Sequence, residues 1–307
     1  MNKPPDLHCI VCNNTDPDGF RVRYKKPGFA VWQCGACGFL FIPSRYRSDV
    51  DYADYKSREV SDRVARGDVW VKKQRNLLRY DLIRKTHPSG SILDVGCGFG
   101  HFLLTGREMG YATSGVEMCR ANADFVQKQF GIPVWRGDFL DFPETGTFDV
   151  ITLWDTLEHM DHADKTIEKA SRLLKPGGLL VVQVPQADSL LARLLGSEWW
   201  AMGPDHANYF SRTTLGTLLE KNGLSVALFR SSIELKNMLV YILIPKWMRL
   251  RGGSGVVATA GRQDVFNRMV NKPFWIKRLL ILAHHAVYRT LSFLRIGDEM
   301  VVTAVKT

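Results

Sequence analysis

The sequence predicts an α/β protein built on a doubly wound parallel sheet, with a small cysteine-rich module in front of it. Three observations support this. Apolar strands and amphipathic helices alternate from residue 91 onward, the first strand runs into a glycine-rich turn, and two Cys-x2-Cys pairs precede them. With 307 residues, 45% of them hydrophobic, the chain is long enough for one large core and a satellite module. We divide it into a cysteine module (1–45), a linker with a helix (46–90), the core (91–231), an insertion (232–296) and a last core strand (297–307).

Composition and terminal sequence narrow the class of protein. The longest wholly apolar runs, 238–245 and 279–283, are far shorter than the roughly 18–20 residues of a membrane span. The first residues, Met-Asn-Lys-Pro-Pro, lack the apolar segment of a secretion signal. We therefore expect a cytoplasmic protein whose cysteines are reduced and not paired in disulfides.

The positive charge of the chain is concentrated in one segment. The net charge is +10, yet residues 232–296 hold 11 Lys and Arg against two acidic residues, so the rest of the chain is close to neutral. A protein that binds nucleic acid over its whole surface would spread this charge more widely. Nucleic acid is therefore not the favoured partner.

The four cysteines of the N-terminal module have the spacing of a metal site. Two Cys-x2-Cys pairs stand 21 residues apart, and turn-forming glycine or asparagine residues lie next to them. Two such pairs present four thiolates to one ion, which suits a closed tetrahedral Zn²⁺ site with a structural role. We predict a zinc ribbon over 1–45, with strands near 29–32 and 39–42 and the ligands Cys9, Cys12, Cys34 and Cys37. The alternative is two pairs of reduced cysteines without a metal.

The elements of the core follow one another in a regular order. Strands are expected near 91–95, 112–116, 132–135, 148–153, 179–184, 224–229 and 299–306. Helices are expected over 101–109, 120–130, 164–174 and 190–200, and from 212 after the capping residue Ser211. Alternating strands and helices predict a parallel sheet that binds its ligand at the carboxyl ends of the central strands.

The turn after the first strand points to the kind of ligand. Its glycines allow close approach of the backbone to a ligand, and they are Gly96, Gly98 and Gly100. Dinucleotide binders place the third glycine one position later. Asp94 would repel a pyrophosphate but attract a cation, and S-adenosylmethionine carries a sulfonium and an ammonium group without phosphate. This cofactor is therefore favoured, with Glu117 at the end of the second strand placed to accept both ribose hydroxyls.

The run Leu-Asp-Val-Gly-Cys-Gly-Phe-Gly and the later Leu-Lys-Pro-Gly-Gly resemble the class I S-adenosylmethionine-dependent methyltransferases. The resemblance covers residues 91–230 and 299–306, and it implies a Rossmann-like seven-stranded methyltransferase sheet. It also implies that Glu117 binds the ribose and that Asp138 contacts the adenine amino group, with Phe139 beside the ring. Trp154, at the end of the fourth strand, is assigned to the same site. The alternatives are a turn residue at Asp138 and a strand-end charge at Glu117.

The cysteine module narrows the group of methyltransferases that the chain resembles. The chain looks like bacterial methyltransferases that act on sugars or glycans and carry an N-terminal four-cysteine module. The Glu-His pair after the fourth strand is also similar to that of ubiquinone-biosynthesis O-methyltransferases.

Candidate catalytic bases follow the fourth and fifth strands. Asp155, Glu158 and His159 would share one face if this segment were helical, because they are spaced i, i+3, i+4. His206 lies in a Gly-Pro loop before Ser211, where related methyltransferases have a histidine facing the acceptor. Its ordinary pKa near 6.5 suits general-base work, so it is our first choice. The alternatives are structural hydrogen bonds made by His159 and His206. The helix over 190–200 ends in two tryptophans and would either roof the acceptor site or pack on the core.

Two flanking segments add basic charge. A helix near 60–86 has Lys and Arg, Arg79 among them, opposite an apolar stripe; it is expected to present a solvated face or contact an anionic acceptor, and by resemblance to fold over the cofactor as a lid. Residues 274–295 are amphipathic with a basic rim. This pattern fits peripheral contact with an anionic membrane, or packing on the core or on a second copy.

The sequence as a whole therefore indicates an enzyme that transfers a methyl group from S-adenosyl-L-methionine to oxygen or nitrogen of a small-molecule acceptor. A sugar, a glycan precursor or a quinone-like lipid is expected. The alternatives are an RNA methyltransferase that uses the ribbon and basic segments, and a non-catalytic scaffold with the same fold.

Overall fold

A computed structural model describes residues 7–43, 69–232 and 297–307. Residues 46–68 of the linker expected over 46–90, and all but the first residue of the basic insertion expected over 232–296, lie outside the described residues, as do the membrane and partner contacts expected of that insertion. None of the helices in the described ranges is both long enough and apolar enough to cross a bilayer.

The core is a seven-stranded sheet with the order β10-β11-β8-β7-β4-β5-β6. Strands β4 to β8 run parallel to one another, and β11 runs antiparallel between β8 and β10. This confirms the predicted doubly wound α/β sheet, which is mostly parallel; the antiparallel direction of β11 was not predicted. The strands span Ser91–Val95 (β4), Ala112–Glu117 (β5), Val134–Arg136 (β6), Phe148–Trp154 (β7), Leu174–Pro185 (β8), Leu224–Ser232 (β10) and Glu299–Lys306 (β11).

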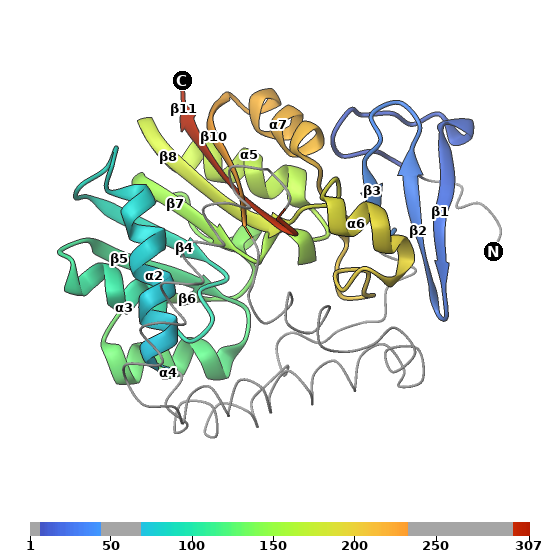
Figure 1. Cartoon of the computed structure of the whole chain (residues 1–307). Coiled ribbons are helices and arrows are strands. Elements are labelled where there is room, and N and C mark those ends of the chain that lie inside the picture. The colour runs from blue at the N-terminus through green and yellow to red at the C-terminus, as the bar shows by residue number, and fades with distance from the viewer. Residues whose placement is uncertain (1–6, 44–68, 233–296) are drawn as a thin grey trace.

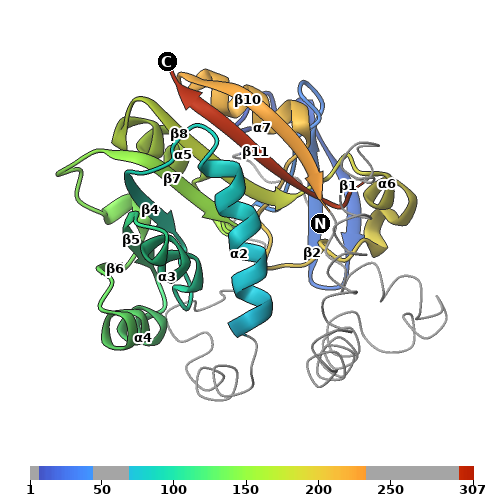
Figure 2. The same ribbon diagram turned by 60° about the vertical axis from the view of Figure 1, so that its left-hand side comes forward.

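Helices cover both faces of this sheet (Figures 1 and 2). Alternate strand residues point to opposite faces, so Ile92 packs in one apolar cluster and Leu93 in the other. The Ile92 cluster includes residues of α2, α3 and α4, and the Leu93 cluster includes residues of α5 and α7. These helices span Val69–Ile83 (α2), His101–Glu108 (α3), Arg120–Phe130 (α4), Ala163–Leu173 (α5) and Arg212–Lys221 (α7).

Local sequence accounts for several helix boundaries and for one correction. Ser211 caps α7, because its side chain accepts from the Thr214 amide while the Thr214 hydroxyl accepts from the Ser211 amide. The helix expected over 190–200 is shorter: α6 spans Leu190–Leu195 and ends at Gly196, which has a φ of 53°. A residue with a positive φ cannot continue an α-helix, and a 3-10 turn runs from there to Glu198.

The cysteine module forms a second sheet that includes a strand from the core. Its order is β1-β2-β3-β9, with β1 at Phe20–Lys26, β2 at Phe29–Cys34, β3 at Leu40–Phe41 and β9 at Asn208–Tyr209. Strands β2 and β3 were expected, whereas β1 and the addition of β9 were not. The module therefore stands against the core at the α6 end of the molecule, as Figure 1 shows.

Candidate active site

The glycine-rich turn lies between β4 and α3, at the carboxyl ends of the parallel strands. Gly96, Gly98 and Gly100 have φ values of 74°, 54° and 67°. A Cβ at Gly100 would lie 2.7 Å from both methyl groups of Val126, so only glycine fits between the turn and α4. A Cβ at Gly98 would meet no described atom within 4 Å. Gly98 is therefore the position where the backbone faces open space, as a close-bound ligand requires.

Glu117 braces this turn from the end of β5. Its Oε2 accepts from the Gly98 amide at 2.7 Å, and its Oε1 accepts from the Cys119 amide at 2.9 Å. Each carboxylate oxygen can accept more than one hydrogen bond, so both retain capacity for ligand hydroxyls. The carboxylate thus lies directly beside the glycine turn, and its contact with ribose hydroxyls stays a prediction.

Asp94 is buried beneath the turn, with 3% of its surface exposed. Burial raises the pKa of its carboxyl to about 7, although a hydrogen bond from Thr152 Oγ1 at 2.6 Å and the charge of Arg79 act in the opposite direction. The carboxyl is therefore balanced between its neutral and ionised forms near neutral pH. A cation bound nearby would favour the ionised form.

Asp138 and Phe139 follow β6, on the same edge of the sheet. Asp138 is exposed, and its Oδ1 accepts from the Leu140 amide at 2.8 Å, which caps a short 3-10 turn. The Phe139 ring is buried in the core and stacks on Phe142 with ring centroids 6.3 Å apart. The adenine contacts of both residues stay predictions.

Trp154 and Asp155 meet a buried arginine that the sequence did not identify as part of the site. Arg79 of α2 is 9% exposed, and its guanidinium lies 4.1 Å from the centre of the Trp154 ring. Its Nη2 donates to Gln183 Oε1 at 3.2 Å and lies 3.6 Å from Asp155 Oδ2. The expectation of a solvated basic face is therefore wrong for Arg79. Helical spacing alone could not reveal this, since the partners of Arg79 lie in β8 and at the end of β7, far from α2 in the sequence.

The histidine and glutamate candidates converge at the end of β7. Ligand-capable atoms of Glu158, His159 and His206 lie within 4.8 Å of one another, and the two imidazole rings are 4.6 Å apart. Glu158 and His159 lie in a 3-10 turn, not in an α-helix. Asp155 is not in this cluster: it has a φ of 53°, and its Oδ1 accepts from Gln183 Nε2 at 2.8 Å.

Glu158 is the most buried member of the cluster, with 2% exposure. Burial, followed by the charges of Asp155 and Asp205, raises the pKa of its carboxyl well above the ordinary value. A neutral carboxyl beside two imidazoles can donate a hydrogen bond, whereas an ionised one could only accept. The cluster therefore combines a buried acid with two imidazoles, whose ring nitrogens can accept or donate a proton, a combination suited to proton transfer.

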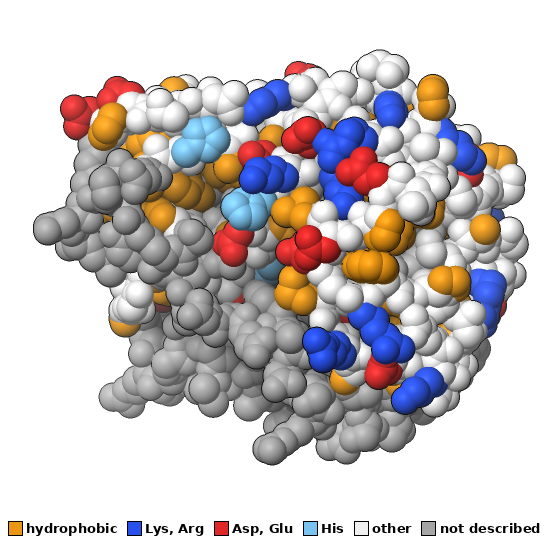
Figure 3. Space-filling model, turned by 180° about the vertical axis from the view of Figure 1, so that it is seen from behind, with side chains coloured by type: hydrophobic (Ala, Val, Ile, Leu, Met, Phe, Trp, Pro, Cys, Tyr) orange, Lys and Arg blue, Asp and Glu red, His pale blue; other side chains and the backbone are white. Residues whose placement is uncertain are grey.

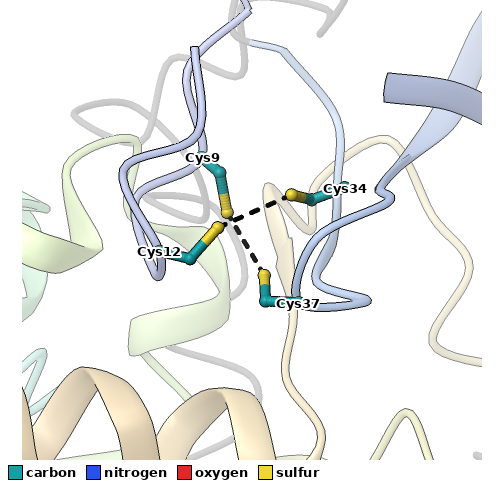
Figure 4. A group of neighbouring side chains, drawn as sticks. All are labelled: Cys9, Cys12, Cys34 and Cys37. Atoms are coloured by element: carbon teal, nitrogen blue, oxygen red, sulfur yellow. Dashed lines mark hydrogen bonds between the residues drawn. The ribbon is translucent and has the colours of Figure 1, made fainter. Parts of the chain in front are cut away.

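The four N-terminal cysteines converge from two loops, as Figure 4 shows. Cys9 Sγ lies 3.5 Å from Cys37 Sγ, and Cys12 Sγ lies 3.7 Å from Cys34 Sγ. A tetrahedral Zn²⁺ with bonds of about 2.3 Å would place its sulfur ligands roughly 3.8 Å apart. All four are free thiols, so the spacing fits a metal site and not a pair of disulfides.

The backbone around Cys34 favours a thiolate. Burial raises its pKa, but hydrogen bonds from the amides of Cys37 and Ala36 and from the Asn14 side chain lower that pKa to about 7. Main-chain amides that point at a cysteine sulfur stabilise the charged form, which is the form that binds metal.

Comparison with known proteins assigns the family. A family model described as a methyltransferase domain matches residues 69–228, about half of the chain. The chain belongs to this methyltransferase family. This confirms the prediction that the chain is a methyltransferase, and the family supports S-adenosylmethionine as its methyl donor.

Among curated relatives, the ubiquinone biosynthesis O-methyltransferase of Ralstonia nicotianae is 29% identical to this methyltransferase over 135 residues. The alignment covers 40% of this chain and 57% of that enzyme. The enzyme of the same name from Paraburkholderia xenovorans is 26% identical over 151 residues, covering 45% and 65%. The methyltransferase thus spans less than two thirds of the length of these two relatives.

A solved structure gives the same fold. The S-adenosylmethionine-dependent methyltransferase of Archaeoglobus fulgidus superimposes with a TM-score of 0.51 at 19% identity, covering 82% of this chain and 100% of that one. At this identity the likeness establishes the fold alone.

Proposed function

We propose that the enzyme holds S-adenosylmethionine against the glycine turn, where Gly98 gives its backbone open access and Glu117 accepts the ribose hydroxyls. Asp94 would face the cationic end of the cofactor, and Asp138 would accept from the adenine amino group. What supports this is the open space at Gly98, directly beside the Glu117 carboxylate. The four positions lie at or just after the carboxyl ends of β4, β5 and β6, and these ends share one edge of the sheet.

Methyl transfer to a hydroxyl or amine also requires a group that removes a proton. When bound, the cofactor supplies an electrophilic methyl group. We assign proton removal to His206, at a ring nitrogen, because it is packed against His159 and Glu158 beside the end of β7. Asp205 positions the pair: its carbonyl oxygen lies 2.8 Å from His159 Nδ1, and its carboxylate lies 3.9 Å from His206 Nε2. This convergence is the observation that carries the proposed chemistry.

The proposed acceptor is a small molecule: a sugar, a glycan precursor or a quinone-like lipid. The names of the curated relatives favour oxygen as the methylated atom. RNA is less favoured. On the face seen in Figure 3, Lys and Arg side chains lie interspersed with Asp and Glu. A protein surface that binds nucleic acid carries mainly positive charge instead.

A transfer assay with tritiated S-adenosylmethionine tests the acceptor class. We would supply catechols as quinone-like acceptors, methyl glycosides and amino sugars as carbohydrate acceptors, and transfer RNA as the competing class. We expect label in a catechol or a sugar. Label that enters only the RNA would overturn the proposal.

We also propose that the four cysteines bind one structural Zn²⁺. The sulfur spacing and the amides around Cys34 support this ion, and four protein ligands leave no open coordination position for catalysis.

The raised pKa of Asp94 predicts that cofactor affinity depends on pH. The free enzyme must lose the Asp94 proton to pair with an ammonium group, so binding should strengthen as pH rises toward and past 7. Between pH 6 and pH 7.5 we expect the affinity for S-adenosylhomocysteine to rise roughly tenfold, measured by titration calorimetry. Asp94→Asn should remove most of this slope. Equal slopes in the two proteins would show that Asp94 does not face the ammonium group.

A further inference from the structure

The cysteine module and the His206 loop are parts of one sheet. Strand β3 pairs antiparallel with β9, with Leu40 opposite Tyr209 and Phe41 opposite Asn208. Strand β9 begins two residues after His206. The module is therefore joined by main-chain hydrogen bonds to the segment that carries the proposed base.

Further hydrogen bonds connect the module to Glu158, the acidic residue beside His159 and His206. The Ile42 amide donates to the Ala207 carbonyl at 2.9 Å, and the Ala207 amide donates to the Glu158 carbonyl at 2.7 Å. Asn208 Nδ2 also donates to the Met160 carbonyl at 2.7 Å. Ala207, the neighbour of His206, is thus held between the ribbon on one side and the Glu158 turn on the other.

Side-chain packing makes a second link that starts at the metal ligands. The Cys34 amide donates to the Phe39 carbonyl at 2.9 Å, which closes the turn between Cys34 and Cys37. The Phe39 ring is 1% exposed, and its centre lies 5.2 Å from that of Phe210, the residue after β9. The position of the cysteine turn therefore determines where Phe39 contacts the His206 segment.

The cofactor half of the site has no strand pairing with the module. The glycine turn, Glu117 and Asp138 lie at the carboxyl ends of β4, β5 and β6, whereas the module pairs only with β9 among the described strands of the core. Apolar side chains of the module share the Leu93 cluster with β4 and β5, but no main-chain hydrogen bonds of a strand pair join them. Small modules of this kind depend on their metal for folding, because they bury too little apolar surface to hold their shape alone.

We infer that the four-cysteine site positions the proton-accepting side of the active site: a bound zinc fixes β3, and β3 fixes His206 through β9. This rests on the proposed zinc ion and on the proposed role of His206. Loss of the metal should lower turnover, because misplacement by about 1 Å can cost up to 10²-fold in rate. Cofactor affinity should not change.

Two variants distinguish loss of the metal from loss of the hydrogen bond that joins the module to the His206 segment. Cys12→Ser removes the exposed ligand of the cluster. Ile42→Pro keeps all four thiols but removes the amide that donates to Ala207, and Ile42→Val is its matched control with the amide intact. For each protein we would measure zinc content by mass spectrometry, amide hydrogen exchange at 206–209 and affinity for S-adenosylhomocysteine. We would also measure turnover with the acceptor that becomes methylated in the transfer assay.

We expect one zinc per chain in the wild type, in Ile42→Pro and in Ile42→Val. Cys12→Ser and Ile42→Pro should both exchange faster at 206–209 and turn over about 10- to 100-fold more slowly, with unchanged cofactor affinity. A wild-type chain that purifies without zinc, or unchanged exchange at 206–209 in Cys12→Ser, would overturn the inference. If Cys12→Ser fails to fold, chelation of the wild type removes the metal without a substitution; if Ile42→Pro fails to fold, exchange at 206–209 with and without the metal decides alone. Faster exchange with normal turnover would retain the link but reject His206 as the base.

Discussion

Replacing His206 by alanine is expected to lower turnover by roughly 10²–10⁴-fold, the range that general-base catalysis contributes. The side chain is 7% exposed and its ring lies 4.6 Å from that of His159, so alanine removes the imidazole from a packed cluster. The affinity for S-adenosylhomocysteine should stay at the wild-type value, because the cofactor residues follow other strands. Turnover with the labelled acceptor and calorimetric titration measure the two quantities separately.

His162→Ala is the matched control for this substitution. His162 is exposed at the start of α5, and its side chain makes no capping hydrogen bond there. We expect normal turnover in this variant. Turnover in His206→Ala that equals that of His162→Ala would exclude His206 as the base and leave it a structural residue of the loop.

Placing a methyl group on Gly98 is expected to weaken binding of S-adenosylhomocysteine by at least about tenfold, equivalent to roughly 1.4 kcal/mol. The new Cβ would occupy the open space beside Glu117, where the proposed cofactor approaches the backbone. The variant Gly98→Ala should also lose about 1–2 kcal/mol of stability, because alanine at a φ of 54° is strained.

Gly110→Ala separates these two effects. Gly110 also has a positive φ, 93°, and a Cβ there would likewise meet no described atom within 4 Å, yet it follows α3 at the opposite end from the turn. We expect a similar loss of stability in thermal unfolding and no loss of cofactor affinity. Equal affinities in the two variants would show that the space at Gly98 is not the cofactor site.

The parts of the fold that the sequence predicted well are those with strong local signals. The strand that runs into the glycine turn, the helix begun by Ser211 and the paired cysteines all depend on residues close together in the chain. Gly196 is also a local signal, because a glycine at this position favours the end of a helix. The helix expected over 190–200 overlooked this signal.

Contacts between distant segments could not be predicted in the same way. Strand β9 has only two residues, too few for any periodicity, and it is a strand because β3 supplies its partner. Arg79 is buried because Trp154, Gln183 and Asp155 meet it there, although its place in a basic helix predicted solvent exposure. The positive φ of Asp155, which separates it from Glu158 and His159, had no local signal either.

The most direct test is a calorimetric titration of the wild-type enzyme with S-adenosylhomocysteine and, separately, with NAD. The Asp94 carboxylate beneath the turn would repel a pyrophosphate and attract an ammonium group, so we expect saturable binding of one S-adenosylhomocysteine per chain and no heat from NAD. Saturable binding of NAD without binding of S-adenosylhomocysteine would contradict the assignment of the glycine turn.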